Sequence, residues 1–96
     1  MNEPFHSLDN LYNYINNAKK IDLLESRIAS KEEDLECAKQ LEEIFVSIKR
    51  AGCEVFIEHT AGTCNRLSKE ILKLKLEKNL IEKEMLQFAL GVLEAE

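Results

Sequence analysis

The feature that most constrains the fold is a heptad pattern in the second half of the chain. Its members are alternately four and three residues apart, and only one is polar: Leu67, Ile71, Leu74, Lys78, Ile81, Met85, Phe88 and Val92. The same spacing extends backwards through Cys64, Thr60, Ile57 and Cys53. Such spacing predicts a long helix that buries one narrow stripe against another helix, as in a coiled coil.

The first half of the chain carries a less regular apolar stripe. It runs through Leu8, Leu11, Ile15, Ala18, Ile21, Leu24, Ile28, Leu35, Ala38, Leu41, Phe45 and Ile48. Two consecutive steps of three residues, from Ala18 to Leu24, turn the stripe around the helix. Ser30 followed by Glu33 is a capping-box pattern, which is typical of a helix start. Residues 7–50 are therefore either one long helix with a kink near 29–31 or two helices with a break near Ser30.

Residues 49–66, KRAGCEVFIEHTAGTCNR, lie between the two stripes. Lys49, Arg50 and Gly52 are typical of a helix C-terminus, where cations favour the helix dipole and glycine adopts the left-handed C′ conformation. The letters EVFIEHT also suit a short strand, but a single strand would have no partner in this chain. We expect a turn at 50–53 followed by a helix, with the state of residues 53–63 left open.

Composition supports long helices, since the chain has only 3 Gly and 1 Pro and 32% of its residues are charged. Gly52 lies near the middle of the 96 residues, so arms 7–50 and 54–95 have similar lengths. We predict an all-α, antiparallel helical hairpin with coiled-coil-like packing that assembles into a helical bundle. Residues 7–96 form one helical domain, Ser7 is its candidate N-cap, and residues 1–6 are expected to be frayed.

Folding the chain at Gly52 pairs residues whose numbers sum to about 104. This register predicts that Glu25 faces Lys78 and that Lys31 unfavourably faces Lys73. It also predicts apolar contacts of Leu24 with Leu80 and of Ile28 with Leu76.

Charge and targeting signals narrow the class of protein. The net charge of −5, from 18 acidic and 13 basic residues, is unlike the basic surface of most nucleic-acid-binding proteins. No segment approaches the roughly 20 apolar residues that span a bilayer, and MNEPFHSLDN does not resemble a secretory signal. Three cysteines are an odd number, which suggests free thiols. We expect a cytoplasmic protein without a membrane partner.

Cys53, His59 and Cys64 form the only grouping of metal-ligating residue types. Their C-x5-H-x4-C spacing lacks the CxxC-type pairs of structural zinc sites. On a helix the two cysteines share a face, while His59 points elsewhere. A cysteine–histidine nucleophile would also need a third group and a pocket, which a narrow hairpin does not provide. We therefore expect no metal, no cofactor and no catalytic site: the chain is not predicted to be an enzyme.

A second apolar row on the C-terminal helix is the main candidate functional feature. Leu72, Leu76, Leu80 and Leu90 lie well around the helix from the heptad stripe, and Leu86 and Leu93 lie between the two. One partner helix covers only one stripe, so these leucines require another cover. Either residues 7–50 bend into two helices that cover both faces, two hairpins pair, or another protein docks. Tyr14, which lies off the first stripe, is a further candidate contact.

The expected function is therefore a non-catalytic protein–protein interaction module. Within this class we expect an adaptor, assembly factor, chaperone or small antagonist, with a protein partner, a homodimer or both. The alternative is a nucleic-acid-binding accessory protein that uses the face from Lys69 to Lys78, where Lys69, Lys73, Lys75 and Lys78 are interspersed with Glu70 and Glu77.

Overall fold

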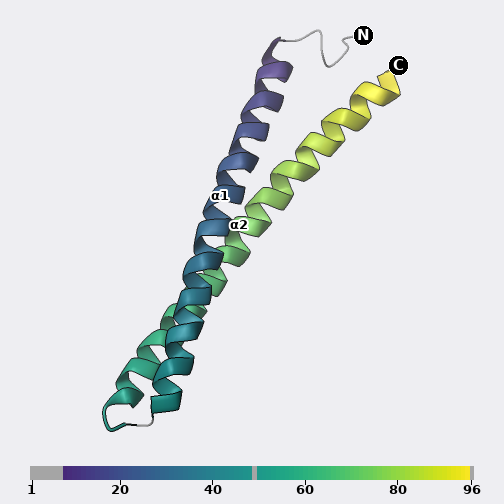
Figure 1. Ribbon diagram of the computed structural model, residues 1–96. Coiled ribbons are helices and arrows are strands. Elements are labelled where there is room, and N and C mark those ends of the chain that lie inside the picture. Colours follow the sequence, from purple (N-terminus) through teal and green to yellow (C-terminus); the bar gives the residue numbers. More distant parts are fainter. Residues whose placement is uncertain (1–7, 49, 96) are drawn as a thin grey trace. The chain divides into compact units, whose positions relative to one another are not determined.

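Two long helices make up the part of the chain that the computed structural model describes, residues 8–48 and 50–95 (Figure 1). Helix α1 spans Leu8–Ile48 (41 residues) and α2 spans Cys53–Ala95 (43 residues). They pack against each other as an all-α helical hairpin, and these two ranges contain no strand. The predicted all-α helical hairpin is confirmed, and residues 53–63 are helical. The expected fraying of residues 1–6 and the Ser7 cap fall outside the described residues.

The contacts between the helices divide into two compact units. The turn unit is Arg27–Leu74 and includes the connection between the helices, whereas the terminal unit combines the residues up to Ser26 with those from Lys75 onwards. Both helices contribute to each unit, so each unit is a pair of helical segments that meet along one stripe.

The core of the turn unit is small and mostly aliphatic. Its buried apolar side chains are Ile28, Ala38, Leu67 and Ile71. Thr60 is also buried, and its hydroxyl donates to the carbonyl oxygens of Phe56 and Ile57, at 2.9 and 3.0 Å. The polar group is thus satisfied within its own helix, which limits the cost of burying it. Nearer the turn, the rings of Phe45 and Phe56 stack with centroids 5.2 Å apart.

The terminal unit holds a buried leucine and an aromatic pair. Leu24 is only 4% exposed, and the rings of Tyr14 and Phe88 lie 5.6 Å apart, centroid to centroid.

On α2, every residue of the predicted heptad pattern from Cys53 to Val92 is buried or half-buried. The heptad prediction for the second half of the chain is therefore confirmed.

Helix α1 departs from its predicted stripe. It runs without interruption through Ser30, so of the two alternatives for residues 7–50 the structure has one long helix. The side chains that face α2 keep a strict three-four spacing and are buried or half-buried: Ile21, Leu24, Ile28, Lys31, Leu35, Ala38, Glu42 and Phe45. Glu42 takes the place predicted for Leu41, which is 47% exposed, as is Ile15. Regular helix geometry selects the position that faces α2, even where an adjacent residue is more apolar.

The turn is closed by one backbone–backbone hydrogen bond and one from a backbone N–H to a side chain. The Cys53 N–H donates to the Arg50 carbonyl oxygen at 3.1 Å, and the Gly52 N–H donates to the Glu54 carboxylate at 3.2 Å. Gly52 has φ +91°, the predicted left-handed conformation. It lies immediately before α2, however, and is not the C′ residue of α1, which ends at Ile48.

Two glycine substitutions test this geometry. Gly52→Ala should destabilise the hairpin by about 1 kcal/mol, because a left-handed backbone strains any residue with a Cβ. Gly62→Ala should stabilise it by up to about 1 kcal/mol, because alanine is the better helix former and nothing lies within 4 Å of the added Cβ. Urea unfolding of both variants measures the two changes. A larger loss for Gly62→Ala than for Gly52→Ala would contradict the turn described here.

Candidate interaction surface

Two lysines in the inter-helical stripe form ion pairs across the hairpin. In the turn unit, Lys31 Nζ donates to Glu70 Oε2 at 2.8 Å. In the terminal unit, Lys78 Nζ lies 3.3 Å from Glu25 Oε1 and 3.5 Å from Glu82 Oε1. The predicted pairing of Glu25 with Lys78 is confirmed. The predicted opposition of Lys31 and Lys73 is wrong, because Lys31 meets a carboxylate instead.

These pairs define the register of the hairpin. The residue numbers of the cross-helix pairs sum to 101 for Lys31–Glu70 and 103 for Glu25–Lys78, slightly below the predicted value. The predicted apolar pairings are wrong: Leu24 and Ile28 are buried, whereas Leu76 and Leu80 are exposed. In the observed register these two leucines belong to the outer side of α2.

The ion pairs shift the ionisation of two side chains. The hydrogen bond from Lys31 lowers the pKa of Glu70, and the positive charges of Lys31, Arg66 and Lys73 act in the same direction against partial desolvation. The hydrogen bond to Glu25 raises the pKa of Lys78, with further attraction from Glu25 and Glu82. Both residues are therefore held in their charged forms, as cross-helix pairing requires.

The predicted basic face is partly neutralised. Lys69, Lys73 and Lys75 are exposed. Lys78 is half-buried and forms ion pairs with two carboxylates. Glu70 lies among these lysines in the sequence and accepts a hydrogen bond from Lys31. Fewer unpaired positive charges remain for phosphate contacts than the sequence suggested.

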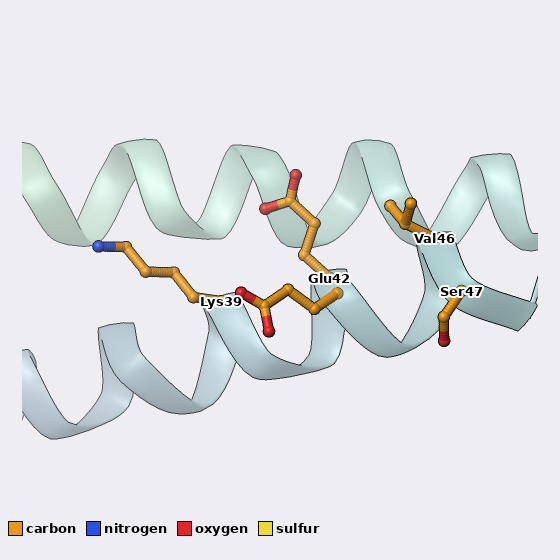
Figure 2. A pocket seen from close by; sticks show the side chains of 5 residues that line it. Lys39, Glu42, Val46 and Ser47 are labelled. Carbon is orange, nitrogen blue, oxygen red and sulfur yellow. The ribbon is translucent and has the colours of Figure 1, made fainter.

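Surface hollows occur in both units. One of about 470 Å³ in the turn unit is lined by five side chains, all from α1: Lys39, Glu42, Glu43, Val46 and Ser47 (Figure 2). Another of about 250 Å³ in the terminal unit is lined mainly by amide and aromatic side chains, among them Asn13, Asn17 and Phe88. Neither set contains a cysteine or histidine that would form a nucleophile–base pair.

The cysteine–histidine grouping does not converge on one point. Cys53 and Cys64 are half-buried in the stripe between the helices, whereas His59 is exposed. The Cys64 thiol points towards Glu42, with Sγ 4.0 Å from Oε2. All three cysteines of the chain are free. Within residues 8–48 and 50–95, no three His, Cys, Asp or Glu side chains are grouped so as to hold a metal ion.

The predicted second apolar row is exposed along its whole length. The leucine row consists of Leu72, Leu76, Leu80, Leu86, Leu90 and Leu93, whose exposed fractions range from 54% to 71%. Leu76 is nine residues from Leu67, which at about 100° per residue places it half a turn from the buried stripe. Tyr14, the other candidate contact, is 38% exposed and packs on Phe88.

Exposed apolar residues outnumber the core throughout the described part of the chain. Sixteen large apolar side chains are exposed there, against five buried apolar ones. Sequence reasoning did not identify the exposed group on α1 near the turn, Leu41, Ile44 and Ile48. These residues have helical spacing, but the apolar pattern of the sequence places Leu41 and Ile48 in the buried stripe. Exposed apolar side chains that gather into a patch usually mark an interface.

Comparison with models of protein families, with curated proteins and with solved structures gave no match. Within the described residues, neither helix has a segment long and apolar enough to cross a membrane.

The Lys31–Glu70 pair predicts a specific pH dependence of stability. The folded pKa of Glu70 lies below the ordinary value of 4.5, so its contribution to stability is complete above that pH and disappears as pH falls through the folded pKa. Glu70→Gln should therefore be less stable than the original chain near neutrality, and the difference should shrink on acidification. Urea unfolding between about pH 6 and about pH 3 measures this. Glu77→Gln is the control, and an equal pH trend in both variants would contradict the assignment.

The cysteine geometry predicts insensitivity to reductants and chelators. Since all three thiols are free, we expect a reducing agent or EDTA to leave the melting temperature within about 1 °C, whereas losing a structural disulfide or zinc would cost several kcal/mol. Thermal unfolding followed by circular dichroism measures the effect. A marked drop with either reagent would contradict the observed arrangement of Cys53 and Cys64.

Proposed function

We propose that this chain is a non-catalytic protein–protein interaction module, an adaptor, assembly factor, chaperone or small antagonist, that docks on a larger partner through an apolar helix face. One observation carries the proposal: the leucine row is exposed on the side of α2 opposite the hairpin contact. Six leucines on one helix are costly to leave in water, and their burial is the main driving force for association.

The other features of the described chain agree with a binding role. The hollows on the two units are open and lack a paired nucleophile and base, so the proposal includes no reaction. The three free thiols fit the cytoplasmic location expected from the sequence. The nucleic-acid alternative is the second candidate. It is favoured by the exposure of Lys69, Lys73 and Lys75 and weakened by the ion pairs of Lys78.

Substitutions within the leucine row test the proposal. The double variant Leu86→Lys/Leu90→Lys should weaken partner binding at least about tenfold, because it places two charges in the apolar contact. The matched control is Val55→Lys, which changes an exposed apolar residue of α2 outside the row. Tagged versions of the three proteins would be compared for capture from an extract of the source cells, after circular dichroism has shown equal helix content.

The expected result is one or more proteins that are retained by the original chain and by Val55→Lys but lost by the double variant. Equal capture by all three proteins would contradict the proposal. Capture that disappears with nuclease, and that falls steeply as salt rises, would instead support the nucleic-acid alternative.

A further inference from the structure

The leucine row contains a second heptad pattern. Five of its six members join Asn79 and Lys83 in an unbroken alternation of four and three residues: Leu72, Leu76, Asn79, Lys83, Leu86, Leu90 and Leu93. All seven side chains are exposed. They span three heptads, or about 32 Å of helix, which is long enough for a coiled-coil contact. Because they lie on the single helix α2, their spacing is set by helix geometry alone.

We propose that this pattern is the contact surface for a second copy of the chain, with the two α2 helices antiparallel. The inference rests on the proposed function, because it assigns an occupant to the same leucine row. In the register where residue numbers sum to 162, Leu72 faces Leu90 of the second copy and Leu76 faces its Leu86. By two-fold symmetry each of these pairs occurs twice. The two copies of Leu80 also lie near the symmetry axis, beside this contact.

The two polar positions determine the orientation and the register. At a sum of 162, Asn79 faces Lys83 of the second copy, so the amide oxygen can accept a hydrogen bond from the ammonium group. A shift of one heptad in either direction would place both polar residues against leucines. A parallel pairing would place the two Lys83 side chains against each other. A polar residue in such a seam lowers stability but excludes these alternatives.

Charge along α2 favours the same orientation. Among the exposed residues of α2, positions 69–77 carry three lysines and one glutamate, whereas positions 83–94 carry one lysine and two glutamates. An antiparallel pair places the basic segment of each helix beside the acidic segment of the other. A parallel pair would place like segments together, which is unfavourable.

Cross-linking in a cysteine-free background tests the register. Cys37, Cys53 and Cys64 are replaced by Ala, and Leu76→Cys and Leu86→Cys are introduced in separate chains. Oxidation of an equal mixture should give disulfide-linked dimers of unlike chains. Leu76→Cys alone should give few, because ten residues, about 15 Å along the helix, separate the two thiols in this register. Efficient linking by Leu76→Cys alone would indicate a parallel pair and overturn the proposal.

Solution mass provides a second test that does not depend on the cysteine variants. By light scattering, the original chain should be a dimer at micromolar concentration, and Leu86→Lys should raise the dimer dissociation constant at least about tenfold. Val55→Lys should behave like the original. A monomer that still captures a partner through Leu86 and Leu90 would overturn the second copy and leave the proposed function standing. A dimer with the predicted cross-link that captures no other protein would support the second copy while contradicting the proposed function.

Discussion

The structure depends on one constraint: two helices can bury only one stripe of each other. In a larger domain, a helix of more than 40 residues would be covered on several sides. Here the inter-helical stripe is the only intramolecular cover in the described chain, and the buried apolar residues are five: Leu24, Ile28, Ala38, Leu67 and Ile71. A core of this size provides little hydrophobic stabilisation for a chain of 96 residues, and association is a common supplement.

The charged residues within that stripe matter because the apolar core is small. Lys31 and Lys78 occupy positions where a coiled coil normally has an apolar side chain, yet each finds a carboxylate on the opposite helix, Glu70 and Glu25 respectively. Such partly exposed pairs contribute little net stability. Their larger effect is on register, because sliding one helix past the other would separate Lys31 from Glu70 and leave Lys78 with Glu82 of its own helix alone. The apolar residues favour helix pairing, and the ion pairs favour one alignment.

Much of this arrangement could be predicted from the sequence, particularly on α2. Its heptad spacing is uninterrupted, so the sequence predicts both which residues of α2 form the buried stripe and which leucines lie outside it. Gly52 was recognised as left-handed because few other residues adopt that conformation readily. On α1 the apolar residues do not keep heptad spacing. The apolar residues alone predict that Leu41 and Ile15 face α2. The residues that face α2 are instead the regularly spaced Glu42 and Tyr14. Ser30 has a capping pattern, but both helical segments around it already pack on α2, and a continuous helix keeps that contact.

The sequence alone does not predict whether α1 packs on the leucine row, because that depends on whether α1 bends. A break near Ser30 would have allowed α1 to supply two helices and cover both sides of α2 within one chain. The continuous α1 removes that possibility for the described residues, and under the proposed function another molecule provides the cover. The two heptad patterns of α2 then differ in the partners of their polar residues. The inner one has its lysine paired within the chain, whereas the outer one has two polar residues, Asn79 and Lys83, for which a second antiparallel copy offers mutual partners.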